Sequence, residues 1–151
     1  MAANVKPIPE GFHTVTPYLV VPKALKLIDF LKQAFDATVI VKMLRPDGTV
    51  HHAEVKIGDS MIMLGEAQDQ SHKPGALYLY VPDVDATYRQ AVQAGATSLS
   101  EPADMFYGDR GGGVEDAWGN TWWIGTHIED VSPEELKKRA ETAAAQRAAK
   151  T

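Results

Sequence analysis

The sequence predicts an α+β fold in which two tandem modules of β-α-β-β-β order form a curved, half-open barrel, followed by a C-terminal helix. The segment YLVVP at residues 18–22 returns as YLYVP at residues 78–82, and each copy precedes a stretch with helical periodicity that ends in a Gln-Ala pair. The segment GDSMI at residues 58–62 matches GNTWW at residues 119–123, in the same order along the chain. Ordered self-similarity of this kind predicts duplication of a module of about sixty residues.

The first module, residues 14–65, is expected to contain one helix and four strands. Apolar residues recur at helical spacing through residues 23–35, which predicts a helix with one buried face. An Arg-Pro-Asp-Gly turn at residues 45–48 and a Gly58-Asp59 turn separate the β-rich runs that follow. Strands are expected at residues 14–21, 38–44, 50–57 and 60–64.

The second module, residues 76–127, repeats this order after a polar linker at residues 66–75. Asp83 or Asp85 can cap its helix, and Gly95 ends it. Strands are expected at residues 76–81, near Ser98, at residues 113–115 and at residues 121–126, the last one after a Trp118-Gly119-Asn120 turn.

A separate helix is expected at residues 132–151. Ser132 is a favourable N-cap, Pro133 suits the first turn, and Glu135 can complete a capping box. The apolar face of this segment is thin, so the helix either faces solvent or packs on a partner subunit.

Composition limits the classes of function. The net charge of −5 and the dispersed Lys and Arg residues argue against a nucleic-acid surface. The absence of cysteine excludes disulfides, zinc–thiolate sites and thiol nucleophiles. The N-terminus has no apolar signal-peptide core, and no apolar run is long enough to cross a membrane. We therefore expect a soluble cytoplasmic protein.

Four segments in a fixed order carry a resemblance to a known family: PYLVV, then PDG with HAEVKIGDSMIML, then LYLYVPDVDA, then FYGDRGGGVEDAWGNTWWIGTHIEDV. This set resembles the vicinal oxygen chelate superfamily, which includes glyoxalase I, bleomycin and fosfomycin resistance proteins and extradiol dioxygenases, and within it the PhnB-like branch. The resemblance covers residues 14–131 and implies a single domain, residues 1–131, whose helices lie on the convex side of the half-open barrel. It also implies a homodimer.

The resemblance implies where a metal would bind. In metal-dependent members four inward residues, typically His, Gln or Glu, meet at the ion, and the repeat register places those positions here at Thr16, Ile62, Ala76 and Trp123. Isoleucine, alanine and tryptophan offer no usable lone pair, and a threonine hydroxyl alone is a weak ligand. We therefore expect no metal ligand and no cofactor.

Strand alternation predicts which side chains face the concave side of the barrel. On the third strand either His52 and Glu54 or His51 and Ala53 point inward, and the first pair is favoured because the neighbouring apolar residues then pack beneath the sheet. The alternative is that the aromatic residues simply fill the core, although buried tyrosine hydroxyls would then need partners. The expected ligand-facing set is Thr16, Tyr18, His52, Glu54, Ile62, Tyr78, Tyr80 and Trp123.

The glycine-rich stretch at residues 106–113 has two interpretations. Arg110 could clamp an anionic substrate in a lid that the glycines allow to move. The stretch could equally be a hairpin that needs positive φ angles, with Asp109 and Arg110 as turn residues. His127, at the end of the last strand, is predicted to belong to a solvated chain exit.

The leading hypothesis is a protein of this superfamily that binds a planar or aromatic small molecule in a Tyr/Trp-lined concavity without a metal and without catalysis. The alternative is a glyoxalase-like lyase or isomerase that holds a metal at displaced positions such as His52, Glu54 and His127. A third hypothesis is a scaffold whose cavity is filled and whose function is association.

Overall fold

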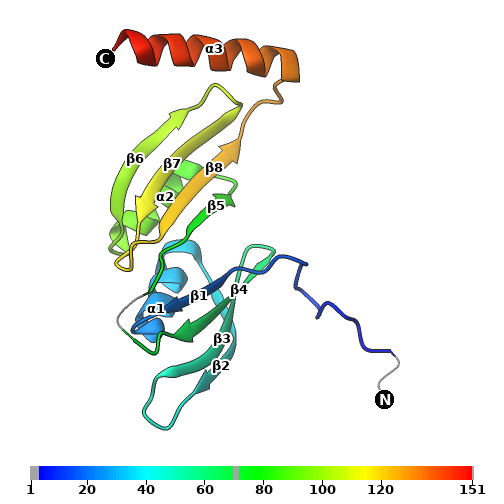
Figure 1. Cartoon of the computed structure of the whole chain (residues 1–151), viewed down its shortest axis with the longest axis vertical. Helices are drawn as coiled ribbons and strands as arrows, with labels where there is room; N and C mark the ends of the chain where they lie inside the picture. Colours follow the sequence, from blue (N-terminus) through cyan, green and yellow to red (C-terminus); the bar gives the residue numbers. More distant parts are fainter. Residues whose placement is uncertain (1–3, 70–71, 151) are drawn as a thin grey trace. The chain divides into compact units, whose positions relative to one another are not determined.

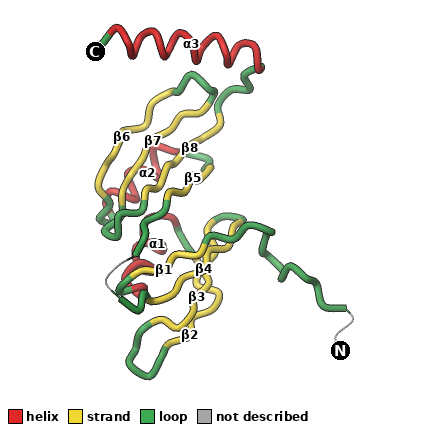
Figure 2. The backbone as a smooth tube through the Cα atoms, viewed as in Figure 1, coloured by secondary structure: helices red, strands yellow, loops and turns green. Residues whose placement is uncertain are grey.

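The structure is a computed structural model that describes residues 4–69 and 72–150, and in it the chain forms two compact units. The first unit extends to Gly75 and includes Gln93–Gly95, and the second holds Ala76–Val92 and the chain from Ala96 onward. Each unit contains one four-stranded sheet and one helix that follows its first strand, and the second unit also contains a C-terminal helix (Figures 1 and 2). The two predicted modules are therefore confirmed, while the half-open barrel that they would form together stays a prediction.

The first unit packs a helix on one face of its sheet. Its elements are β1 (Tyr18–Val21), α1 (Ala24–Phe35), β2 (Thr38–Leu44), β3 (Val50–Ile57) and β4 (Ser60–Glu66). The strand order is β1-β4-β3-β2, with β1 parallel to β4 and the other pairs antiparallel. The apolar stripe of α1, including Leu27 and Leu31, is fully buried, as are Ala53 and Val55 of β3. The helical periodicity in the sequence thus marks the face that forms the core.

The second unit repeats this architecture. Its elements are β5 (Ala76–Tyr80), α2 (Val84–Gln93), β6 (Thr97–Asp104), β7 (Asp109–Glu115) and β8 (Thr121–His127). The order is β5-β8-β7-β6, again with one parallel pair, β5 and β8. Val114, Trp122 and Ile124 are fully buried and form the centre of its core. The strands near Ser98 and at residues 113–115 are longer than predicted, because glycine-rich β7 pairs along its whole length with β6 and β8.

The duplication extends to the hydrogen bonds at the start of each helix. In the first unit the Glu66 carboxylate accepts the backbone N–H of Ala24, with N···O distances of 3.2 and 3.3 Å. In the second unit the Thr126 hydroxyl accepts the N–H of Val84 at 2.9 Å. Both pairs satisfy a helix N–H that lacks an intrahelical partner, and they occupy corresponding positions in the two units.

The pairing register of β4 and β8, the closing strands of the two units, corrects the alignment of the two repeats that was inferred from the sequence. Tyr18 lies opposite Met63, and Tyr78 lies opposite Trp123, so Met63 corresponds to Trp123. The sequence alignment instead matched Gly58 with Gly119, which made Ile62 the counterpart of Trp123. The turns differ in length: Ile57 pairs with Ser60 across two residues, whereas Glu115 pairs with Thr121 across five. A one-residue error reverses the face on which a strand residue lies.

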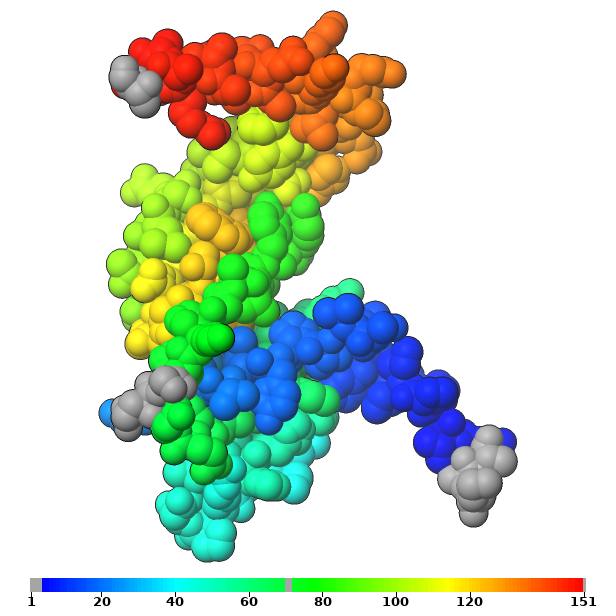
Figure 3. Space-filling view, in the orientation of Figure 1, coloured from blue at the N-terminus to red at the C-terminus, as the bar shows by residue number. Residues whose placement is uncertain are grey.

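Helix α3 (Pro133–Ala149) follows the second sheet. The Ser132 hydroxyl accepts the N–H of Glu135 at 3.2 Å, which confirms the predicted N-cap. No residue of α3, coloured orange to red in Figure 3, is buried. Arg139 holds it to the rest of the unit by pairing with Glu129 and by donating to the carbonyl of Phe106 at 3.2 Å. Of the helices in the described part of the chain, none combines the length and apolarity needed to cross a membrane.

The Asp116 carboxylate organises the five-residue turn before β8. It is buried and accepts the backbone N–H groups of Trp118 and Asn120, each at 2.9 Å. It also accepts the Asn120 side-chain amide at 3.0 Å and the indole N–H of Trp122 at 2.8 Å. This residue therefore joins the turn to the largest fully buried side chain of the core.

We predict that Asp116→Ala lowers the free energy of unfolding by roughly 2–4 kcal/mol, because several buried donors lose a charged acceptor. The measurement is urea unfolding followed by circular dichroism. Asp59→Ala is the matched control, since Asp59 is exposed and its carboxylate accepts the hydroxyl of Ser60 in the corresponding turn. Unfolding curves that coincide for the two variants would contradict this role of Asp116.

Candidate functional site

Each sheet has one face toward its helix and one open face. In the second unit the open face carries Tyr78, Tyr80, Trp123 and Asp109, from β5, β8 and β7. Their alternation with the buried residues Trp122 and Ile124 follows from the two-residue period of a strand. The predicted facing of the two tyrosines and Trp123 therefore holds within this unit.

Glycines form the floor beneath these rings. A β-carbon at Gly113 would run into the Trp123 ring, and one at Gly125 would come within 2.9 Å of ring carbons of Tyr78. A β-carbon at Gly111 would lie 3.6 Å from the Tyr78 hydroxyl. The rings lie over bare backbone because these positions have no side chain.

The glycine-rich stretch has two parts, and the hairpin interpretation holds for only one of them. Gly111–Gly113 lie inside β7 and none of them has a positive φ, so neither a mobile lid nor a turn requirement accounts for them. Only Gly108, with φ of 100°, takes the conformation that the hairpin interpretation required. It belongs to the turn between β6 and β7, where its N–H donates to the carbonyl of Met105.

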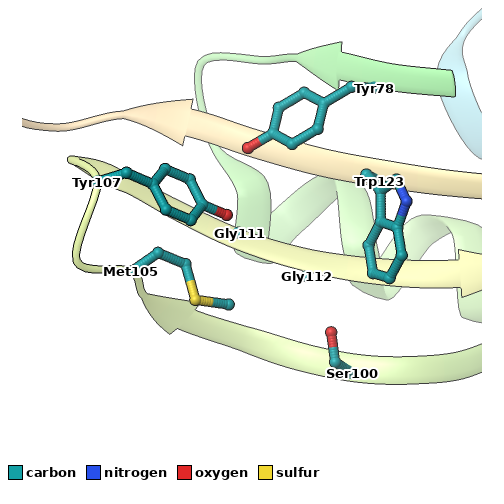
Figure 4. Close-up of a pocket in the computed structure, with 7 residues that line it drawn as sticks. All are labelled: Tyr78, Ser100, Met105, Tyr107, Gly111, Gly112 and Trp123. Carbon is teal, nitrogen blue, oxygen red and sulfur yellow. The ribbon is translucent and has the colours of Figure 1, made fainter. Parts of the chain in front are cut away.

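A cavity of about 330 Å³ opens above this floor (Figure 4). Aromatic rings and a methionine side chain form its walls, and a serine hydroxyl lies at one end. It is lined by Tyr78, Ser100, Met105, Tyr107, Gly111, Gly112 and Trp123. All of these residues belong to the second unit. Tyr78 and Trp123 were predicted from the sequence, whereas Ser100, Met105 and Tyr107 were not, because they reach the cavity only through the pairing of β6 with β7.

The Asp109 carboxylate anchors the polar edge of this face. It is 3% exposed, and one of its oxygens accepts the hydroxyls of Tyr78 at 2.8 Å and Tyr80 at 2.9 Å. The other oxygen lies 2.9 Å from Nδ1 of His127, whose Nε2 lies 2.7 Å from the carboxylate of Asp130. His127 is thus half-exposed and engaged at both nitrogens. The predicted solvated chain exit is confirmed by the exposure of residues 127–130, whereas the contact of His127 with Asp109 was not predicted.

These contacts shift the ionisation of the groups. Burial, and then the hydrogen bond to Asp109, raise the pKa of Tyr78 well above its ordinary value, and the same hydrogen bond raises the pKa of Tyr80. Burial disfavours the charged form of Asp109, but hydrogen bonds from His127, Tyr78 and Tyr80 together lower its pKa. The bond to Asp109, followed by the bond to Asp130, raises the pKa of His127. Near neutral pH the carboxylate is ionised and both tyrosines are protonated.

The open face of the first unit carries a different set. Tyr18 packs edge-on against His52 with ring centroids 6.3 Å apart, and Nε2 of His52 lies 3.0 Å from Oε2 of Glu54. The favoured inward pair of β3 is therefore adjacent to Tyr18. Ile62, in contrast, is 4% exposed and opposite Val55 in the core, so its predicted position on the open face is wrong; Met63 occupies it. Thr16 precedes β1, and its hydroxyl donates to the carbonyl of His13 at 3.1 Å.

Arg110 points to the helix side of the second sheet. Its guanidinium makes a two-pronged ion pair with Asp85 of α2, at 2.8 and 2.9 Å, and a further pair with Asp104 at 3.1 Å. These pairs raise the pKa of Arg110. Arg110 joins α2 to the sheet, and the cavity is lined by other residues.

The residues at the four expected metal positions do not fit a divalent ion. The Thr16 hydroxyl is engaged by backbone, and Ala76 and Trp123 have no ligating atom. Met63, which the corrected register puts in place of Ile62, offers only a soft thioether. Throughout residues 4–69 and 72–150, no group of three or more His, Asp or Glu side chains is arranged to hold a metal.

Comparison with known proteins places this architecture in a family. Residues 11–124 match the family described as the Glyoxalase/Bleomycin resistance protein/Dioxygenase superfamily. The uncharacterized protein Mb0911c of Mycobacterium bovis is 34% identical over 149 residues, which cover 91% of this chain and 94% of that protein.

Two solved structures show the same fold. TioX from Micromonospora sp. ML1 has a TM-score of 0.65 at 20% identity, covering 76% of this chain and 99% of TioX. A PhnB protein from Bacillus cereus has a TM-score of 0.56 at 15% identity, covering 76% and 99%.

We predict that Gly113→Ala displaces the Trp123 ring and costs about 1–3 kcal/mol of stability, the usual penalty for overpacking. Near-ultraviolet circular dichroism reports the ring, and urea unfolding reports the stability. Gly75→Ala is the control, because a β-carbon there meets no atom within 4 Å. An unchanged tryptophan spectrum in Gly113→Ala would show that the glycine does not hold the ring in place.

The raised pKa of His127 predicts a specific pH dependence. The protonated ring is favoured in the folded state, so the stabilisation is complete below the unfolded-state value of about 6.5 and is lost as pH rises through the raised folded-state value. His127→Gln should therefore lower the free energy of unfolding more at about pH 5.5 than at about pH 9. Equal losses at both pH values would contradict the linkage.

Proposed function

The chain belongs to the glyoxalase/bleomycin resistance protein/dioxygenase superfamily, and from this membership we propose that it binds a small planar or aromatic molecule on the open face of its second unit, without a divalent metal. The observation that supports the proposal is the aromatic cavity above the glycine floor. Its volume of about 330 Å³ suits a compact ligand of two or three fused rings. We further propose the homodimer that the family resemblance implied.

The exposure of the aromatic rings favours a ligand over a filled core. Trp123 is 40% exposed and Tyr78 is 43% exposed, although both lie on a hydrogen-bonded strand pair. Covering large solvent-exposed rings with a flat apolar surface is favourable, and offset stacking of the rings stabilises the complex further. The glycine floor keeps the rings in place before a ligand arrives, which lowers the entropic cost of binding.

Binding of this kind needs no reacting group. The polar groups near the cavity are hydroxyls and one buried carboxylate, which suits orientation of a ligand rather than attack on it. The metal-free proposal rests on the donor-poor side chains at the four positions that the family resemblance assigns to a metal.

The alternative is a metal-dependent, glyoxalase-like lyase or isomerase. It is favoured by one observation, the His52–Glu54 pair at 3.0 Å on the open face of the first unit, where imidazole and carboxylate could both ligate an ion. His127, the third displaced ligand considered, is engaged by Asp109 and Asp130 instead. We therefore rank binding ahead of catalysis.

We predict that flat tricyclic compounds quench the tryptophan fluorescence of the protein in a saturable manner. Trp123→Phe should remove most of this quenching, because Trp123 forms a wall of the cavity. Trp118→Phe is the matched control, since Trp118 lies in the turn before β8 and outside the cavity lining, and it should keep the quenching.

Two outcomes would overturn the proposal. Quenching that persists in Trp123→Phe would place binding elsewhere. An increase of several degrees in melting temperature with nickel, zinc, manganese or cobalt, lost in the His52→Ala, Glu54→Ala double variant, would support the enzyme instead.

A further inference from the structure

The hydroxyl of Tyr78 has its single proton committed to a carboxylate. A tyrosine hydroxyl offers one donor and two lone pairs, and an ionised carboxylate can only accept. Tyr78 therefore donates to Asp109, at 2.8 Å, and has only lone pairs left for anything else that approaches. Turning the proton away would leave a buried charge short of one hydrogen bond, which is costly. The raised pKa of Tyr78 means that the hydroxyl remains protonated throughout the physiological range.

This acceptor lies at the cavity. Tyr78 lines the cavity, and its ring lies on the floor formed by Gly125 and Gly111. In Figure 4 the hydroxyl ends of Tyr78 and Tyr107 are directed toward the same region of the cavity, near Gly111. Tyr80 donates to the same oxygen of Asp109 at 2.9 Å but does not line the cavity. Two tyrosines thus share one electrostatic environment, and only one of them can touch a ligand there.

The surroundings favour positive charge over negative charge. None of the residues that line the cavity is Lys, Arg or His, and the nearby Arg110 is paired with Asp85 and Asp104 on the other face of the sheet. The walls present aromatic faces, which attract cations. The Tyr78 hydroxyl is hydrogen-bonded to the Asp109 carboxylate. His127 contacts this carboxylate with one ring nitrogen and the Asp130 carboxylate with the other. The residues that line the cavity therefore provide hydroxyl groups and ring faces, and none of them is a cation that could receive an anionic group.

We propose that this cavity selects planar aromatic ligands that carry a cationic or N–H donor group, which the Tyr78 hydroxyl accepts while Asp109 holds that hydroxyl in its acceptor orientation. The inference rests on the proposed function and adds the chemical class of the ligand. Tyr78 is the residue that determines this specificity, and Asp109 is a positioning residue that acts through it.

The test uses two compounds with the same three-ring frame and opposite charge, 9-aminoacridine as the cation and 9-anthracenecarboxylate as the anion, titrated into the full chain by calorimetry. We expect the cation to bind at least tenfold more tightly, which corresponds to about 1.4 kcal/mol. Tyr78→Phe keeps the ring and removes the acceptor, so it should lower the affinity for the cation about tenfold while leaving the anion unaffected.

Tyr80→Phe is the matched control. It removes the same kind of hydrogen bond from the same oxygen of Asp109 but leaves the cavity lining intact, so the preference for the cation should remain. A loss of preference in both variants would mean that Asp109 acts only through general destabilisation, and it would overturn the role of Tyr78.

The remaining outcomes separate this inference from the proposed function. If both compounds bind equally well and Trp123→Phe abolishes both, the cavity binds aromatic molecules but the inference about charge is wrong. If neither compound binds, the proposed function fails for planar aromatic ligands and the inference fails with it. A cation that binds preferentially and loses affinity only in Tyr78→Phe and Trp123→Phe would support both.

Discussion

The open face of the second sheet depends on the absence of β-carbons at two positions. Gly113 and Gly125 let the rings of Trp123 and Tyr78 lie directly on the backbone of neighbouring strands. Glycine in a strand interior weakens the strand, so each of the two needs a compensating reason. Here the reason is close approach: a β-carbon at Gly113 would displace the Trp123 ring, and one at Gly125 would displace the Tyr78 ring and move its hydroxyl away from Asp109.

The two units show how a duplicated scaffold diverges on one face while the other is retained. Both units bind the first N–H of their helix through a side chain of the closing strand, and both place a tyrosine over a glycine, Gly65 beneath Tyr18 and Gly125 beneath Tyr78. In the first unit Glu54 of β3 lies opposite Met63 of β4. In the second unit the corresponding residue, opposite Trp123 of β8, is Gly113 of β7. The first unit thus carries a polar His–Glu pair where the second has an aromatic cavity.

A buried carboxylate gives the cavity its polarity. Desolvation disfavours the charge on Asp109, and the hydrogen bonds from two tyrosines and a histidine offset that penalty. Such a network is stable only when each member has its partner, so it also keeps the tyrosine hydroxyls in one orientation. The geometry that we propose for recognition of a ligand is therefore the same geometry that keeps Asp109 ionised.

The sequence by itself determined the order of helices and strands, the duplication, the Ser132 cap and the facing of Tyr78, Tyr80 and Trp123, because these depend on local periodicity and on chemistry within a few residues. Only the tertiary structure decided that Met63 rather than Ile62 faces outward, since this depends on turns of different length that shift the pairing register by one residue. The contacts of Asp109 with Tyr78 and His127, and of Arg110 with Asp85, likewise join residues far apart in the chain. Alternation along a strand can place Asp109 on the same face as Gly111 and Gly113, but a hydrogen-bond partner on another strand is set by how the strands pair.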